Sequence, residues 1–201
     1  MLAGVNGAGK SSIGGHLLRR AGLDWFNPDT CARELIALTG CSQAEANALA
    51  WQEGLRRLDE ALANGRHHAF ETTLGGDTIA QRLREASASH EVLVWYCGLA
   101  SPEQHIARVA ARVAAGGHDI PEAKVRERWE RSQLNLIALL RHLSRVQVYD
   151  NSAEAPPGAP VPDPRRIADI QAGRLVWPTG AEELQHTPGW ARALLGAAMP
   201  H

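Results

Sequence analysis

The sequence has few of the features that mark secreted or membrane proteins. Its three cysteines are an odd number at wide spacing, at Cys31, Cys41 and Cys97, and they match neither a disulfide framework nor a zinc-ligand pattern. We interpret them as free thiols in a reducing cytosol. No apolar run approaches the roughly 20 residues of a membrane-spanning helix, and a glycine-rich motif that begins at Gly4 leaves no room for a signal peptide. We therefore expect a cytoplasmic protein that does not bind membranes.

The chain also lacks an excess of charge of either sign. The formal net charge of the 201 residues is -1, so no global field attracts nucleic acid or an anionic membrane. Aromatic residues make up only 5% of the chain, and the six tryptophans are scattered without an interleaved basic stripe. We interpret the tryptophans as core anchors rather than a stacking platform and expect no nucleic-acid partner.

The chain alternates short apolar runs with long helical stretches. Strands are predicted at residues 1–3, 23–27, 67–71, 91–97 and 146–149. Helices are predicted at residues 10–20, 30–38, 43–63, 78–86, 102–115 and 121–143. This alternation indicates an α/β fold, with about five parallel strands flanked by helices.

The most specific motif lies at the start of the chain. The run Gly4-Val5-Asn6-Gly7-Ala8-Gly9-Lys10-Ser11 fits the Walker A pattern in full. In such a loop, successive backbone N–H groups point at phosphate oxygens, and the helix that follows adds its positive end. Lys10 would contact the β- and γ-phosphates, and the Ser11 hydroxyl would bind Mg²⁺. The sequence therefore predicts a site for ATP and Mg²⁺ formed by Gly4, Asn6, Gly7, Ala8, Gly9, Lys10, Ser11 and Ser12.

Polar residues follow two of the predicted strands, where open α/β sheets place their ligands. Asp29 comes after the strand at 23–27, and a carboxylate there could accept the proton of an attacking hydroxyl. Alternatively, Asp29 could be the N-cap of the next helix. Glu71 and Thr73 end the strand at 67–71, and we expect both to contact a substrate.

The two helices predicted between residues 101 and 143 carry several arginines, of which five are candidates for a phosphate-binding role: Arg108, Arg112, Arg126, Arg128 and Arg131. The helices are joined by a glycine-containing turn at 116–121, so they could close over a nucleotide and neutralise the transferred phosphoryl group. Alternatively, these arginines could belong to a solvated surface. His118, in the turn, is a candidate substrate contact or a structural turn histidine.

These features define an expected domain organisation. We predict a P-loop core over residues 1–152, with a helical arginine lid at about 101–143. Proline and alanine dominate residues 155–160, which suggests a linker or a surface segment. We expect residues 153–201 to form this linker and a helical tail, with helices near 181–185 and 190–195, packed on the core.

Several stretches together resemble the zeta toxin-like family of P-loop kinases, whose members are often labelled simply as ATPases. They are Leu2-Ala3 with the Walker A run, Asn27-Pro28-Asp29, Phe70-Glu71-Thr72-Thr73, the stretch 112–121, Arg128-Trp129-Glu130-Arg131-Ser132, Asn135-Leu136 and Tyr149-Asp150-Asn151-Ser152. The resemblance covers about residues 2–152. It implies a fold like that of small-molecule and nucleotide kinases.

The resemblance also implies an activity, the transfer of a phosphoryl group from ATP to a hydroxyl. In characterised zeta toxins this hydroxyl belongs to UDP-N-acetylglucosamine, so a nucleotide sugar is the implied small-molecule partner, and an antitoxin protein is an implied macromolecular one. Matched by position, the catalytic residues are Lys10, Asp29 as general base, and the lid arginines Arg112 and Arg128. The candidate substrate-binding residues are Asp29, Glu71, Thr73, His118 and Arg131.

A second hypothesis is an ATP-binding switch or ATPase that acts on a macromolecular partner. Such proteins usually carry a Walker B strand that ends in Asp. The strand predicted at 91–97 leads instead into Gly98 and Leu99. The sequence therefore favours a kinase over a switch.

Overall fold

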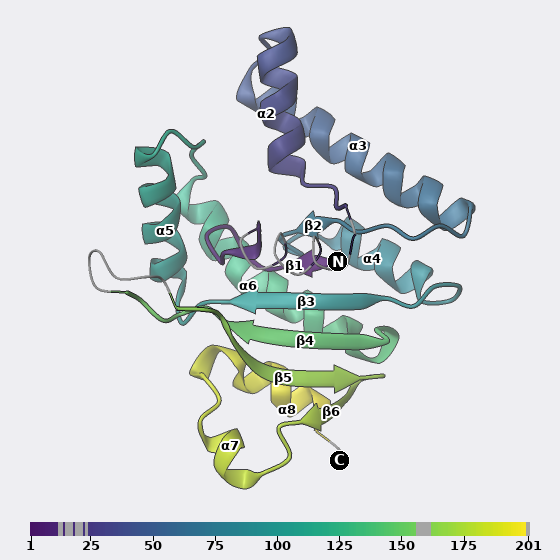
Figure 1. Cartoon of the computed structure of the whole chain (residues 1–201), viewed down its shortest axis with the longest axis vertical. Coiled ribbons are helices and arrows are strands. Elements are labelled where there is room, and N and C mark those ends of the chain that lie inside the picture. Colours follow the sequence, from purple (N-terminus) through teal and green to yellow (C-terminus); the bar gives the residue numbers. More distant parts are fainter. Residues whose placement is uncertain (12–13, 15–17, 19–21, 23, 156–161, 200–201) are drawn as a thin grey trace.

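The computed structural model describes residues 1–11, 14, 18, 22, 24–155 and 162–199. Their centre is a six-stranded sheet in the order β2-β1-β3-β4-β5-β6 (Figure 1). Its strands are β1 (Leu2–Ala3), β2 (Glu71–Thr72), β3 (Leu93–Gly98), β4 (Arg145–Asp150), β5 (Arg165–Gln171) and β6 (Arg174–Trp177). The first four are parallel, whereas β5 and β6 are antiparallel to their neighbours. The predicted α/β sheet is confirmed, but it is mixed rather than purely parallel.

The helices lie close to the predicted ranges. They are α2 (Pro28–Thr39), α3 (Gln43–Ala63), α4 (Asp77–Ala86), α5 (Pro102–Ala114), α6 (Glu122–Leu139), α7 (Ala181–Gln185) and α8 (Arg192–Ala198), with short 3₁₀ turns at Leu140–His142 and Gly189–Ala191. Local signals explain several boundaries. Ser42 and Glu45 form a capping box at the start of α3, and Gly40 ends α2 in the left-handed conformation. No helix in these described ranges is both long and apolar enough to span a bilayer.

Two of the predicted strands are shorter than expected. In the described part of the strand predicted at 23–27, residues 24–27, the structure has one isolated parallel bridge, between Phe26 and Phe70. The strand predicted at 67–71 is reduced to this bridge and the short β2. The helix predicted at 10–20 lies largely outside the described residues.

The larger correction concerns the tail. The sequence predicts a linker and helices after residue 152, but β5 and β6 extend the sheet there. Strand β5 escapes hydropathy patterning because its buried positions, residues 167–170, are consecutive and include a charged residue, Asp169. Arg145 on β4 compensates that charge, donating from Nε to the Asp169 carboxylate at 2.9 Å.

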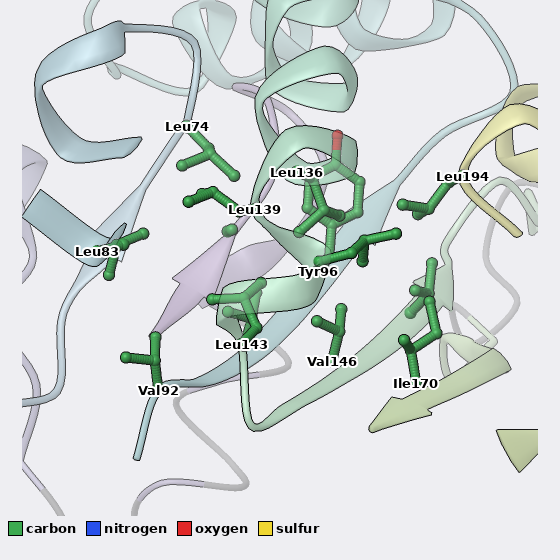
Figure 2. Close-up of a cluster of buried hydrophobic side chains, with 14 of the residues drawn as sticks. Leu74, Leu83, Val92, Tyr96, Leu136, Leu139, Leu143, Val146, Ile170 and Leu194 are labelled. Carbon is green, nitrogen blue, oxygen red and sulfur yellow. The ribbon is translucent and has the colours of Figure 1, made fainter. Parts of the chain in front are cut away.

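The main hydrophobic core lies between the sheet and the helices α4, α6 and α8 (Figure 2). Leu136 and Leu139 of α6 pack over Tyr96 of β3, and the same cluster includes Ile170 of β5 and Leu194 of α8. The Tyr96 hydroxyl donates to Ser132 Oγ at 3.1 Å, which satisfies the one polar atom of this ring. Residues of the tail are therefore part of the same core as the phosphate-loop half of the chain.

The α2–α3 pair extends away from the sheet above β1 and β2 (Figure 1). It has a small core of its own, formed by Ala32, Ala46 and Ala50. Helix α5 and the start of α6 are held together by Val109 and Val125. The phosphate loop thus lies between two helical arms, α2–α3 on one side and α5–α6 on the other.

Candidate active site

The phosphate loop follows β1 directly and is closely packed. Gly4 and Gly9 have φ angles of +140° and +85°, a region that side chains strongly disfavour. A Cβ on Gly4 would lie 2.2 Å from the Cys97 carbonyl oxygen, and one on Gly9 would lie 2.4 Å from Asn151 Nδ2. These glycines are therefore required both by conformation and by the close approach of the residues beneath the loop.

Buried side chains hold two carbonyl groups of the loop. His105 of α5 is 1% exposed, and its Nδ1 lies 2.8 Å from the Asn6 carbonyl oxygen. Burial lowers the pKa of His105 to about 4, so the ring is neutral and Nδ1 carries the donated hydrogen. The Asn151 amide donates to the Ala8 carbonyl at 2.9 Å. The Cys97 thiol, whose pKa burial raises to about 12, donates to the same oxygen.

Lys10 and Ser11 converge on the carboxylate of Glu71. The Ser11 hydroxyl lies 3.0 Å from Glu71 Oε2, and Lys10 Nζ lies 3.6 Å from Glu71 Oε1. The Asn27 amide donates to the same carboxylate at 2.9 Å. Lys10 and Glu71 are each 8% exposed, so the two opposite charges are buried together.

This group of oxygens fits Mg²⁺. A hydroxyl and a carboxylate are the hard oxygen ligands that Mg²⁺ prefers, and this ion usually retains several waters and binds substrate phosphates as well. No cluster of three or more histidine, cysteine or acidic side chains suited to a metal occurs among the described residues, so a closed all-protein cage is absent there. Sequence reasoning placed Glu71 on the substrate, whereas its carboxylate is turned toward Ser11 and Lys10.

Asn27, rather than Asp29, caps helix α2. Its Oδ1 accepts hydrogen bonds from the backbone N–H groups of Asp29 and Thr30, at 2.9 Å and 3.2 Å. The alternative interpretation of Asp29 as the N-cap is therefore wrong. Sequence reasoning missed Asn27, although the order Asn-Pro is itself a signal, because proline favours the first helical position and thus places the cap one residue earlier.

The Asp29 side chain points instead at the opposite helical arm. Its carboxylate lies 3.8 Å from Arg112 Nη1 and 4.0 Å from His118 Nε2. Arg112 also donates to the His118 carbonyl at 3.4 Å. The structure therefore brings together three residues that the sequence singled out at positions far apart in the chain.

The other arginines predicted for the lid occupy different positions. Arg128 donates to the Asn6 side-chain oxygen at 2.8 Å, directly over the phosphate loop. Arg131 pairs with Asp77 at an exposed rim.

Two of the five arginines are engaged elsewhere. Arg126 pairs with Glu103 on the surface. Arg108 donates to the backbone oxygen of Asn151 at 2.8 Å and so fastens the segment after β4.

Thr73 is held by its backbone, because its carbonyl accepts from Ser132 Oγ at 2.7 Å. Ser12, predicted at the nucleotide, lies outside the described residues.

A cavity of about 610 Å³ joins these groups. It lies between the α2–α3 arm and the α5–α6 arm, at the edge of the phosphate loop. Residues from both arms and from the loop line it, including Lys10, Asp29, Glu71, Thr73, His118, Arg128 and Arg131. Such a volume is in the range of pockets that bind small molecules.

Two solved structures share this fold. A chain from the PezAT chromosomal toxin–antitoxin system of Streptococcus pneumoniae superimposes with a TM-score of 0.61 at 15% identity, over 99% of this chain and 76% of that one. A Chloroflexus aurantiacus protein described as a candidate kinase gives a TM-score of 0.51 at 17% identity, over 66% of this chain and 77% of that one. The predicted resemblance to zeta toxin-like P-loop kinases is thus confirmed at the level of the fold.

A comparison with curated proteins finds no match. A family model described as an AAA domain, AAA_33, matches residues 1–135, which include the whole phosphate loop, Asp29, Glu71 and the two arginines Arg112 and Arg128. The chain belongs to this AAA domain family of P-loop nucleotide-binding proteins.

Proposed function

We propose that this protein is an ATP- and Mg²⁺-dependent phosphotransferase that phosphorylates a hydroxyl of a small metabolite. The observation that carries the proposal is the position of Asp29. Its carboxylate lines the same cavity as Lys10 of the phosphate loop, and Arg112 and His118 of the opposite arm face it. A carboxylate beside the phosphate end of a small-molecule cavity suits a general base for an acceptor hydroxyl.

Each side chain has a definite role in this reaction. Asp29 accepts the proton of the acceptor hydroxyl, whose oxygen forms the new bond to the γ-phosphorus while the bond to the β-phosphate oxygen breaks and ADP leaves. Lys10 neutralises the β- and γ-phosphates, and Arg112 and Arg128 stabilise the charge on the transferred group. The Ser11 hydroxyl and the Glu71 carboxylate would hold Mg²⁺, which would supply further neutralisation of phosphate charge.

The lid residues also limit hydrolysis. Arg112 and His118 reach Asp29 from the far arm, so closure of this arm narrows the opening through which water enters the cavity. Exclusion of water favours transfer to the acceptor over transfer to water. A switch ATPase has no need of a carboxylate directed into an acceptor cavity, so Asp29 favours the kinase.

A UDP-activated amino sugar such as UDP-N-acetylglucosamine is the acceptor to test first. Its support is the resemblance of the site motifs to zeta toxin-like kinases, together with a fold shared with a chain of a toxin–antitoxin system. The same fold likeness makes an antitoxin a candidate partner. In this proposal the protein acts in the cytoplasm, where ATP and nucleotide sugars are available.

The test is ADP release with Mg²⁺-ATP against a panel of hydroxyl acceptors that begins with UDP-N-acetylglucosamine. We expect ADP release that depends on one acceptor and a product heavier by one phosphate. Lys10→Ala should abolish the transfer, whereas Asp29→Asn should lower kcat about 10²- to 10⁴-fold and spare ATP binding. Equal loss of both properties in Asp29→Asn would give Asp29 a structural role instead.

A matched pair of arginine variants separates lid chemistry from surface charge. Arg112→Gln should lower turnover strongly, because Arg112 faces Asp29. Arg126→Gln removes the same charge from the same arm but breaks only a surface pair with Glu103, and it should leave turnover unchanged. ADP release that needs no acceptor and is insensitive to Arg112→Gln would contradict the kinase.

A further inference from the structure

The floor of the phosphate loop is made by the carboxyl ends of β3 and β4. The Cys97 thiol and the Asn151 amide both donate to the Ala8 carbonyl of the loop. The two strand ends are also bonded to each other, because the Asn151 backbone N–H donates to the Gly98 carbonyl at 3.0 Å. The position of the loop therefore depends on whatever holds Gly98 and Asp150, the neighbours of Cys97 and Asn151 in the chain.

Trp190 of the tail contacts both strand ends from the side of the main core. A Cβ on Gly98 would lie 2.4 Å from Trp190 Cη2, so a glycine is required there to leave room for the indole. The indole Nε1 donates to Asp150 Oδ1 at 3.1 Å. The side chain is 7% exposed, and its ring lies beside that of Tyr96, with 6.2 Å between the ring centroids. One side chain of the tail thus holds the ends of both strands beneath the loop.

A turn links Asp150 to the direction of the Asn151 side chain. Asp150 Oδ1 also accepts from the Ser152 backbone N–H at 3.3 Å and from the Ser152 hydroxyl, which is the pattern of an Asx turn. Asn151 is the central residue of this turn, so the direction of its amide follows from the position of Asp150. Only 14% of the Asp150 side chain is exposed. Without the indole, this buried carboxylate would lose the donor that comes from the core.

Helix α5 holds the same segment by different atoms. Arg108 donates to the Asn151 carbonyl at 2.8 Å, and Gln104 Nε2 donates to the Ser152 carbonyl at 2.7 Å. These bonds fix the backbone within and after the turn, whereas Trp190 acts on the strand ends that lead into it. The tail thus supplies a contact that the lid arm does not duplicate.

We propose that Trp190 is a positioning residue for nucleotide binding. It holds the ends of β3 and β4, and so keeps in place the two side chains that bond to the Ala8 carbonyl. The loop N–H groups thereby keep the arrangement that binds phosphate. The inference rests on the proposed function only in that the loop binds Mg²⁺-ATP. It assigns the tail a part in this binding, although the described residues that line the cavity extend no further than Arg131.

The alternative is that Trp190 only anchors the core, which is the interpretation made from the sequence for all six tryptophans. That interpretation is wrong for Trp51, which is 50% exposed. For Trp190 it accounts for the burial of the ring but not for the bond to Asp150. A core anchor changes the free energy of unfolding and leaves the folded site as it is. A positioning residue also changes the affinity of the folded protein for nucleotide, so a binding measurement separates the two.

The experiment measures by calorimetry how a non-hydrolysable ATP analogue binds to the full chain with Mg²⁺, well below the unfolding temperature of each protein. Trp190→Phe keeps a ring against Gly98 but removes the donor to Asp150, and Trp190→Leu removes both contacts.

Two variants serve as controls. Trp177→Phe makes the same chemical change on β6, where the ring lies 5.1 Å from the Arg166 guanidinium. Leu194→Ala removes a fully buried side chain of α8 from the same core. It therefore lowers stability without removing the bond between Trp190 and Asp150.

We expect the two Trp190 variants to raise the Kd of the ATP analogue about 3- to 30-fold, with the larger effect in Trp190→Leu. Both controls should keep the Kd of the wild type, although Leu194→Ala lowers the Tm. In turnover, the Trp190 variants should raise the KM for ATP with little change in kcat, because Asp29 and Arg128 come from α2 and α6.

A double-mutant cycle tests whether Trp190 acts through Asp150. Asp150→Ala removes the acceptor of the indole bond. Addition of Trp190→Phe to this variant should therefore raise the Kd no further. Additive effects of the two substitutions would refute the route through Asp150.

Equal Kd values in the wild type and both Trp190 variants would overturn the inference. An equal rise of the Kd in Leu194→Ala would also overturn it, because any loss of core packing would then disturb the site. The outcomes separate this inference from the proposed function. Transfer to an acceptor with unchanged nucleotide binding in the Trp190 variants would leave the kinase standing and refute the role of Trp190. Nucleotide binding that depends on Trp190, without transfer to any acceptor, would do the reverse.

Discussion

His105 allows a quantitative test of how the phosphate loop is held. The ring is 1% exposed and donates to the Asn6 carbonyl. Its pKa is lowered from 6.5 to about 4, chiefly by burial, with the hydrogen bond to Asn6 acting in the opposite direction. The folded protein therefore keeps His105 neutral at pH values where the unfolded chain protonates it.

The sign and size of the effect follow from this difference. Between pH 6.5 and about 4 the unfolded state binds a proton that the folded state does not, so stability falls as the pH falls through this window. The whole shift corresponds to about 3 kcal/mol, of which about 2 kcal/mol is lost by pH 5. This loss is a large fraction of the roughly 5–15 kcal/mol that stabilise a typical domain.

The variant His105→Asn isolates this contribution. Its amide can donate to the Asn6 carbonyl from nearly the same place as Nδ1, but it does not titrate. Urea unfolding at pH 7.5 and pH 5.0 gives the change in unfolding free energy for each protein. We expect the wild type to lose about 2 kcal/mol more than the variant between the two pH values. Contributions from other groups, such as His68 with its lowered pKa, occur in both proteins and cancel.

The reasoning would be refuted by equal pH dependence in the two proteins, because His105 would then titrate alike in both states. A lower stability of the variant at both pH values would not contradict the reasoning, because the test compares the two proteins only in how much their unfolding free energy changes between the two pH values. ATP affinity should follow the same pattern. Burial of the imidazolium is unfavourable, so protonation favours opening of the packing around His105 and loosens the loop, and the wild type should lose ATP affinity at low pH more steeply than His105→Asn.

Two further substitutions test the packing around the site. Gly9→Ala places a Cβ 2.4 Å from Asn151 Nδ2 at a φ of +85°, so we expect the free energy of unfolding to fall by about 1–3 kcal/mol and Mg²⁺-ATP to bind more weakly. Thermal unfolding with and without nucleotide measures both effects. Unchanged nucleotide binding would mean that the loop tolerates displacement. Arg145→Met removes the main partner of Asp169, which is 5% exposed, so urea unfolding should show a loss of about 2–3 kcal/mol at neutral pH. Full stability in this variant would argue that β5 does not share the core.

The sequence predicted those parts of the site that depend on residues close together in the chain, or on a general rule of sheet topology. It did not predict contacts between residues far apart in the chain. The phosphate loop is a local structure, because its turns depend on glycines within eight residues, and the motif alone located it. Asp29 and Glu71 were found by a general rule, since carboxyl ends of parallel strands meet at one edge of the sheet. The roles of His105 and Asn151 in holding the loop were not predicted, because their partners are backbone carbonyls 99 and 143 residues away, and no pattern in the sequence indicates such bonds.

Strands β5 and β6 were not predicted from the sequence, for a different reason. Strand β5 buries Asp169 at a position where hydropathy patterning expects an apolar residue, and its charge is compensated by Arg145 on the neighbouring strand. The pairing is visible only after β4 and β5 are aligned in register. The linker composition at 155–160 then favoured the interpretation of the residues beyond it as a helical tail packed on the core rather than as further strands of the sheet. In the structure, Trp190 of this tail donates to Asp150 and lies against Gly98.

The five arginines predicted for the lid differ in their partners, and this difference is visible only in the structure. By their place on the two predicted helices they are equivalent, since any could face a phosphate, and it was the family resemblance that singled out Arg112 and Arg128 as catalytic and Arg131 as substrate-binding. Arg126 and Arg131 each have an acidic partner at 2.6 Å, on a different element. A close carboxylate already neutralises these two charges, and the pairs lie at exposed positions. Their positive charge is therefore less available to a bound phosphate than that of an arginine without such a partner.

Arg112 and Arg128 differ in that respect. Arg128 donates to the neutral side-chain amide of Asn6 at 2.8 Å. Arg112 lies at 3.8 Å from Asp29, longer than a direct hydrogen bond. Both guanidinium groups therefore keep much of their capacity to bind an anion and lie beside the phosphate loop, where a triphosphate would bring several negative charges. Positive charge at this position would favour an anionic ligand, and this preference supports the proposal that Arg112 and Arg128 act in phosphoryl transfer.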